Sequence, residues 1–293
     1  MCFGAPLNAI DAADGTRLHL QHWPAPGAAH GTVQIVHGLG EHIGRYAGLA
    51  RDLNRAGWHV AGHDQRGHGH SGGPRGALPS AVALLEDLAT VIERLRGPGR
   101  HVLLGHSMGG LVAARFCAES LAAAPAPWWR ELDGLVLSSP ALDAGMNSLQ
   151  KGLLALLGPL APNLRVNNGL LPGWISRDPA VVAAYVDDPL VHDRVTPRLA
   201  RFIVDGGVRV LQDAPRWRLP TLLMWAGADR CVAPQGSARF AASAPESVLT
   251  AQLFEPLFHE IFNEPERDQV ILALTGWLSR FETANRPPCP PEP

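Results

Sequence analysis

The chain has 293 residues, of which 46% are hydrophobic, and its formal net charge is −2. This composition is typical of a globular protein, and the length suits one large α/β domain with an insertion, which we favour over two small domains. The small net charge gives no reason to expect a nucleic-acid partner. The four cysteines, at positions 2, 117, 231 and 289, lie far apart, which favours free thiols over a disulfide framework. Because we find no secretory signal and no apolar stretch long enough to span a membrane, we expect a cytoplasmic location.

The first half of the chain alternates between predicted strands and helices. Strands are expected at 16–23, 32–36, 58–62, 100–105 and 134–138. Three helices are expected: one at 45–56, a second that begins after an N-cap at Ser80, and a third that begins at Met108. Gly57 is expected to end the first of these helices. Strands that alternate with helices in this way predict a mostly parallel, doubly wound α/β sheet.

The alternation stops between residues 141 and 210, where a leucine-rich stretch is followed by short pieces separated by prolines. We interpret this segment as a helical cap, inserted over the active edge of a core formed by residues 1–140 and 211–285. An apolar pocket under such a cap is expected to hold the substrate. The residues expected to line it are Leu149, Leu153, Leu157 and Val191. The leucine-rich stretch is also expected to touch membrane or micelle surfaces transiently.

The strand pattern returns at 221–226 and 247–254, and a closing helix is expected at 266–281. The proline-rich tail at 286–293 is expected to be disordered.

Ser107 lies in the pattern Gly105-His106-Ser107-Met108-Gly109, between a predicted strand and a predicted helix. This is the pattern of a nucleophile elbow, in which a sharp turn lifts a serine above the end of the sheet. Glycines two residues before and after the serine leave room for the strained turn. The helix that follows points its free N–H groups at developing negative charge. The alternative is an ordinary glycine-rich turn.

Two further loops carry glycine and histidine. Residues 37–42 follow a buried strand at the edge where α/β sheets bind ligands, so they form either a simple turn or an oxyanion hole. Residues 63–73 contain several histidines, but their glycines prevent regular geometry and no acidic cluster accompanies them. We therefore predict no metal site there.

A serine needs a base to remove its proton, and the base needs an acid to orient it. In sheets of this class the order along the chain is serine, acid, histidine, which leaves His192 and His259 as candidates for the base. His192 falls in the predicted cap, so His259 is preferred. Asp229 follows a strand end and is preferred as the acid over Asp143 and Asp205.

The chain resembles the α/β-hydrolases of the monoacylglycerol lipase and lysophospholipase group over nearly its whole length. The segments that carry the resemblance are HGLGEHIGRY at 37–46, HDQRGHGHSGG at 63–73, GHSMGG at 105–110, DDPLV at 187–191, GADRCVAP at 227–234 and HEIFNE at 259–264. The resemblance implies that Ser107 is the nucleophile, with Asp229 and His259 as its partners. It also implies that the backbone N–H groups of Leu39 and Met108 form the oxyanion hole.

The implied activity is hydrolysis of lipid carboxylic esters, most simply monoacylglycerols, through an acyl-enzyme on Ser107 and without a metal or organic cofactor. Lysophospholipase and broad carboxylesterase activities are the alternatives, because Leu39 occupies a position where lipases of the group often have alanine. A non-catalytic binding module with this fold would usually show a broken triad, and this triad is complete.

Cys231 lies two residues after Asp229. We expect Arg230 to favour its thiolate form, and a bulky adduct on the sulfur to displace the Asp229 loop. Maleimide reagents are therefore predicted to inhibit the enzyme through Cys231.

Overall fold

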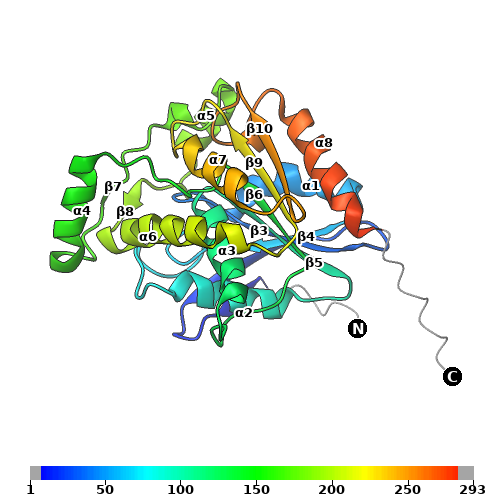
Figure 1. The fold of residues 1–293 in the computed structure, drawn as a ribbon, viewed down its shortest axis with the longest axis horizontal. Coiled ribbons are helices and arrows are strands. Elements are labelled where there is room, and N and C mark those ends of the chain that lie inside the picture. Colours follow the sequence, from blue (N-terminus) through cyan, green and yellow to red (C-terminus); the bar gives the residue numbers. More distant parts are fainter. Residues whose placement is uncertain (1–7, 283–293) are drawn as a thin grey trace.

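The computed structural model describes residues 8–282, so the predicted disordered tail at 286–293 lies outside the described residues, as do Cys2 and Cys289. Eight strands form one sheet in the order β1-β2-β4-β3-β5-β6-β9-β10 (Figure 1). The strands are β1 (Ala9–Asp11), β2 (Arg17–Trp23), β3 (Gly31–Val36), β4 (His59–His63), β5 (Arg100–His106), β6 (Gly134–Ser138), β9 (Thr221–Ala226) and β10 (Leu249–Phe254). Within this eight-stranded sheet only the pairs that involve β2 are antiparallel, β1 with β2 and β2 with β4, which confirms the predicted, mostly parallel α/β sheet.

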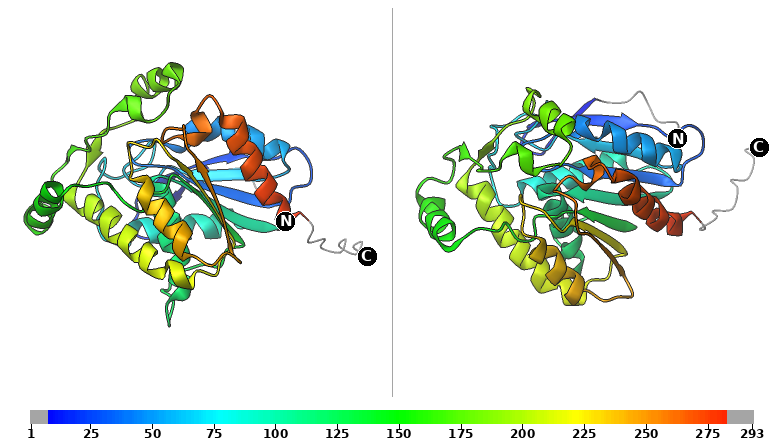
Figure 2. Two further views of the ribbon diagram at one scale, coloured as in Figure 1. Left: turned by 45° about the horizontal axis from the view of Figure 1, so that its top comes forward. Right: turned by 90° about the horizontal axis from the view of Figure 1, so that it is seen from above.

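Helices cover both faces of this sheet (Figure 2). The helices are α1 (Ala47–Arg55), α2 (Ala83–Leu95), α3 (Met108–Ala118), α4 (Ser148–Leu160), α5 (Pro179–Val186), α6 (Pro197–Asp213), α7 (Pro234–Ser243) and α8 (Arg267–Leu278). Side chains of α1 and α8 pack in one apolar cluster with the sheet, and those of α2, α3, α6 and α7 pack in another. Alternate residues of the central strands feed the two clusters, Val102 and Leu104 one and Leu103 the other. This alternation explains why the strands read as continuous apolar runs.

Most predicted elements in the core lie within a few residues of their observed positions. The helix predicted from Ser80 begins only at Ala83, so the N-cap prediction was wrong; the Ser80 hydroxyl instead accepts from Val82 N–H at 3.4 Å. The short edge strand β1 was missed, because three residues are too few to show an alternating pattern. Gly57, at φ 78°, follows the end of α1 as predicted.

The segment between β6 and β9 contains α4, α5 and α6 and a small two-stranded sheet of β7 (Val166–Asn167) and β8 (Arg194–Val195). Figure 1 shows α4 at the edge of the molecule, away from the large sheet. The predicted boundary of the insertion at residue 210 lies inside α6, which continues to Asp213. Because the buried face of α6 belongs to the core cluster around α3, this helix joins the insertion to the core. No helix among residues 8–282 is both long and apolar enough to cross a membrane.

Candidate active site

Ser107 lies between the end of β5 and the start of α3, at φ 55° and ψ −122°. A positive φ is strained for a residue with a side chain, and such strain gathers at functional sites. A Cβ on Gly109 would lie 2.1 Å from the Val36 carbonyl oxygen, and one on Gly105 would lie 2.5 Å from the Gly109 carbonyl oxygen. Both positions therefore need glycine. This is the predicted elbow, and it requires glycines because other backbone segments come too close to leave room for a side chain at these two positions.

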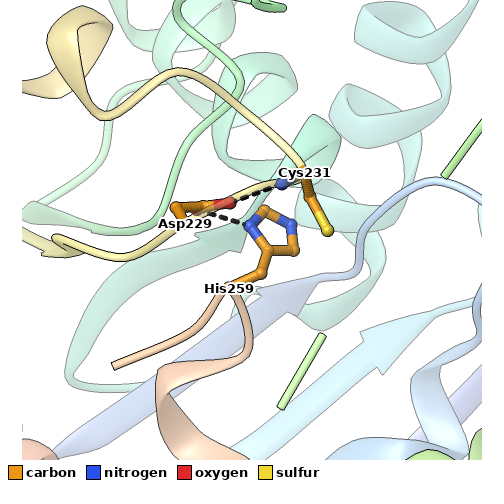
Figure 3. Close-up of side chains that lie close together, drawn as sticks. All are labelled: Asp229, Cys231 and His259. Atoms are coloured by element: carbon orange, nitrogen blue, oxygen red, sulfur yellow. Dashed lines mark hydrogen bonds and ion pairs between the residues drawn. The ribbon is translucent and has the colours of Figure 1, made fainter. Parts of the chain in front are cut away.

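His259 and Asp229 come from loops after neighbouring strands, β10 and β9 (Figure 3). The His259 Nδ1 atom lies 2.7 Å from Asp229 Oδ2, and both side chains are almost fully buried. The other carboxylate oxygen, Oδ1, accepts from the backbone N–H groups of Cys231 at 2.8 Å and Val232 at 3.1 Å. Both Asp229 oxygens are thus occupied, which holds the carboxylate still and fixes the orientation of the imidazole.

The charge environment favours the protonated form of His259. Burial alone would lower its pKa, but the negative charge of Asp229 and the hydrogen bond to it outweigh burial, so that the pKa is raised above the ordinary 6.5. The ring of His106 lies 4.7 Å from that of His259. Burial and the neighbouring His259 lower the pKa of His106 to about 4, so His106 is neutral at physiological pH. His259 is therefore the histidine suited to carry a proton.

The loop of residues 37–42, which we call the oxyanion loop, is held from several sides. Gly38 N–H donates to Glu41 Oε1 at 2.5 Å, and His37 accepts at Nε2 from Gln65 N–H at 2.9 Å. On the far side, His192 N–H donates to the Gly40 carbonyl at 2.8 Å. A backbone fixed in this way suits an oxyanion hole, which works only when its donors are in place before the charge develops.

Two cavities meet at Ser107. The first, of about 520 Å³, contains Ser107 and His259 in its wall, together with polar groups of Tyr185, Asp188 and His192. The second, of about 510 Å³, is lined mainly by apolar residues. Its apolar lining includes Met108, Leu153, Leu154, Trp174, Val195 and Ile203. The residues shared by both cavities are Leu39, Ser107, Asn167, Asn168, Gly169, Leu170 and Cys231.

The predicted substrate-binding residues fall in different places. Val191 lines the first cavity and Leu153 the second, although the Leu153 side chain is 54% exposed. Leu149 lies on the surface at 82% exposure, because it is on the outer side of α4, and its assignment to the pocket is corrected accordingly. The side chain of Leu157 is outside the described part of the chain. The segment 167–170 lines both cavities together with Ser107 but was not predicted, since no pattern in the sequence marks it.

The other candidates for acid and base have different roles. Asp143 accepts from Arg239 at 2.7 Å, and Asp205 pairs with Arg201 at 3.3 Å on the surface. His192 donates from Nε2 to the Gly67 carbonyl at 3.1 Å, and burial lowers its pKa to about 4. It lines the first cavity from the segment that was predicted to form the cap.

The pKa of the Cys231 thiol differs from the one expected from its neighbour Arg230. Burial raises the pKa of its thiol, and the negative charges of Asp229 and Glu260 raise it further. The guanidinium of Arg230 instead lies 5.2 Å from the centre of the Phe258 ring. The prediction that Arg230 favours the thiolate was therefore wrong. Asp229, Cys231 and His259 each have one oxygen, nitrogen or sulfur atom within 4.8 Å of the others, a spacing at which side chains can hold a metal ion (Figure 3). Both oxygens of Asp229, however, already have hydrogen-bond partners in the protein.

Comparison with known proteins places the chain in a family. Residues 27–266 match the family described as serine aminopeptidase, S33. A monoacylglycerol lipase of Mycolicibacterium smegmatis is 33% identical over 90% of this chain and 93% of its own length. An uncharacterized abhydrolase domain-containing protein of Dictyostelium discoideum is 31% identical over 93% of this chain, which spans 29% of that relative's length.

Among solved structures, the crystal structure of a Paleococcus ferrophilus monoacylglycerol lipase superposes with a TM-score of 0.80. The two chains are 36% identical over 90% of this chain and 99% of the Paleococcus ferrophilus chain. Likeness of fold and sequence over almost the full length, together with the elbow at Ser107, excludes a chance match of short motifs. The chain therefore belongs to the serine aminopeptidase S33 family of α/β-hydrolases, in the group that includes the monoacylglycerol lipases.

Proposed function

We propose that this protein hydrolyses monoacylglycerols to a fatty acid and glycerol, with Ser107 as nucleophile, His259 as base and Asp229 as the acid that orients it. As a member of its family it is a serine hydrolase that cleaves carboxylic esters of lipids. The observation that carries the residue assignment is the buried 2.7 Å contact between His259 and Asp229, because His259 shares the wall of the first cavity with the strained Ser107.

The reaction proceeds in two halves. The Ser107 oxygen attacks the ester carbonyl carbon while its proton passes to His259 Nε2, and the resulting oxyanion accepts hydrogen bonds from the N–H groups of Leu39 and Met108. The bond to glycerol then breaks, and the glycerol oxygen takes the proton from His259. A water molecule attacks the acyl-enzyme in the same way, its proton passes through His259 to Ser107, and the fatty acid leaves.

The two cavities support a division of the substrate at Ser107. The apolar second cavity suits an acyl chain, because burial of each methylene contributes about 0.8 kcal/mol. The wall of the first cavity contains apolar residues as well, but it adds the polar side chains of Tyr185 and Asp188, which suit the hydroxyls of glycerol. Relatives are named monoacylglycerol lipases, which agrees with this division. Leu39 belongs to both walls, so its side chain limits the bulk of the ester group that can reach Ser107.

Contact with a membrane or micelle surface is proposed for α4. Leu149 and Leu160 are 82% and 73% exposed on this helix, and Leu156 is exposed as well. Exposed leucines gathered on one helix at the edge of the molecule suit partial burial in a lipid interface, where the substrate is concentrated. The proposed cytoplasmic location stays a prediction.

Replacement of Ser107 by alanine tests the assignment. The variant should lose at least about a thousandfold in activity on a monoacylglycerol and should no longer react with a fluorophosphonate probe, while its thermal unfolding is unchanged. Ser120→Ala is the matched control, because Ser120 is exposed just after α3 and its hydroxyl donates to the Cys117 carbonyl at 2.8 Å, away from both cavities. Retained hydrolysis in the Ser107 variant would refute the proposed function.

A further inference from the structure

Three charged side chains form a buried bridge beside the site. The guanidinium of Arg45 donates to Glu41 Oε2 at 2.7 Å and, through two nitrogens, to both carboxylate oxygens of Glu260 at 2.7 and 2.8 Å. The three side chains are 11%, 5% and 7% exposed respectively. Glu41 and Glu260 are 219 residues apart in the sequence, so the bridge joins two distant parts of the chain.

Each end of the bridge holds a loop of the active site. Glu41 Oε1 accepts from Gly38 N–H at 2.5 Å, directly before Leu39, and the Tyr46 hydroxyl donates to the same oxygen at 2.7 Å. Glu260 is the residue after His259, and its side chain also accepts from Asn263 at 2.8 Å. One end therefore holds the backbone of the oxyanion loop, and the other holds the loop of the base.

Arg45 itself stands behind the site. Glu41 and Glu260 are part of the wall of the first cavity, whereas Arg45 lines a separate void of about 20 Å³, which is too small for a substrate. Its guanidinium also lies 4.8 Å from the centre of the Tyr185 ring, which faces the first cavity. Any effect of Arg45 on the reaction must thus pass through its partners.

We propose that Arg45 is a positioning residue, which holds the oxyanion loop and the His259 loop at a fixed separation through Glu41 and Glu260. This inference rests on the proposed function, because it assigns Arg45 to the same reaction. The bridge contains two carboxylates and one guanidinium, so one negative charge remains uncompensated beside His259. That surplus charge stabilises the imidazolium that forms when Ser107 attacks.

The charged groups that face His259 are consistent with this role. Burial lowers the pKa of His259, and Asp229 is the largest cause that raises it. The negative charges of Glu260 and Glu41 are the next causes that raise this pKa. His106 is kept neutral by burial, which lowers its pKa to about 4. Burial raises the pKa of Cys231, so its thiol stays uncharged. The bridge is therefore the main source of charge near His259 besides Asp229, among the described residues.

Three substitutions test the proposal without leaving an unpaired buried charge. Glu260→Gln and Glu41→Gln each remove one carboxylate, and Arg45 remains paired with the other. Arg45→Lys keeps the positive charge but loses the planar fork that contacts both carboxylates. For each variant, kcat, KM and the pH profile of kcat/KM would be measured on a soluble monoacylglycerol, together with thermal unfolding.

We expect kcat to fall between about tenfold and a hundredfold in Glu260→Gln and Arg45→Lys, with KM changed less than about twofold, since small displacements of reacting groups affect the rate more than binding. The acid limb of the pH profile should move to lower pH in Glu260→Gln and Glu41→Gln, and it should stay in place in Arg45→Lys. If the bridge had only a structural role, the acid limb would not shift in the two variants that remove a negative charge.

The control is Asp87→Asn. Arg66 also joins two carboxylates, with 2.6 Å contacts to Asp87 and a 2.8 Å contact to Asp14, but neither acid lines the cavities around Ser107. This variant should cost stability without a shift of the pH profile. Equal losses of kcat in Asp87→Asn and Glu260→Gln, or an unmoved acid limb in both glutamine variants, would overturn the proposal.

Labelling of the unmodified protein separates the two levels of inference. If a fluorophosphonate probe does not react at Ser107 in the parent, the proposed function itself fails. If the parent is labelled but the bridge variants match its kcat and pH profile, only the role of Arg45 is refuted.

Discussion

The backbone N–H of His192 donates to the carbonyl of Gly40 at 2.8 Å, and this bond joins the insertion between β6 and β9 to the oxyanion loop. Gly40 has φ 80°, and a Cβ at this position would lie 2.3 Å from the His192 carbonyl oxygen. The two backbones thus lie as close as a glycine allows. The segment around His192 therefore helps to set the position of the neighbouring Leu39 N–H.

Gly40→Ala should reduce kcat at least about a hundredfold, because the new methyl group must push the oxyanion loop away from His192 and displace the Leu39 donor. The measurement is steady-state hydrolysis of a monoacylglycerol. Gly15→Ala is the matched control: Gly15 has a similar φ of 79°, but a Cβ there would have no atom within 4 Å. If both variants lose activity equally, backbone strain rather than the clash is the cause.

The pH dependence of hydrolysis should follow His259. The base must be neutral to accept the Ser107 proton, and its pKa is raised, so kcat/KM should fall as the pH drops through a value above 6.5. Asp229→Asn should lower kcat by about four orders of magnitude and move this limb to lower pH, because the largest cause that raises the pKa is removed. A limb that stays in place in the variant would show that another group titrates.

Leu153 and Leu149 should have separable effects. Leu153 lines the apolar cavity, so Leu153→Asp should reduce hydrolysis of long-chain esters more than that of acetyl esters. Leu149 is 82% exposed, so Leu149→Asp should leave dissolved substrates unaffected and slow hydrolysis only when the substrate is in vesicles. Rates on acetyl, long-chain and vesicle-bound esters provide the comparison. Equal losses on acetyl and long-chain esters in Leu153→Asp would indicate misfolding.

Cys231 should react slowly with maleimides at pH 7 and faster as the pH rises, because burial and the nearby carboxylates raise the pKa of its thiol. Mass spectrometry of the alkylated protein would follow the adduct, alongside residual activity. Cys231→Ala should remain active, since residue 231 donates its hydrogen bond to Asp229 from the backbone N–H, which alanine keeps. Rapid loss of activity at pH 7 through an adduct on Cys231 would contradict this prediction.

Local features of the sequence were sufficient to predict the α/β sheet and the elbow at Ser107, and they led to the proposal of His259 and Asp229 as its partners. The elbow requires particular glycines, strands show their apolar runs, and the order of the three groups follows from the order of the strands. The distance between His259 and Asp229 agrees with their assignment to one pair. Residues whose role depends on their own backbone conformation or on their place along the sheet can be recognised in this way.

Other features depended on the tertiary structure. The Glu41–Arg45–Glu260 bridge joins residues 219 positions apart, and nothing in either local pattern indicates the other. The same holds for the segment 167–170, which lines both cavities together with Ser107, and for Leu149 and Leu153, which lie on one helix but have different surroundings. The charge of Cys231 also followed burial rather than its neighbour Arg230. Burial and contacts between distant segments arise only when the chain packs, so a sequence pattern with a range of a few residues does not contain them.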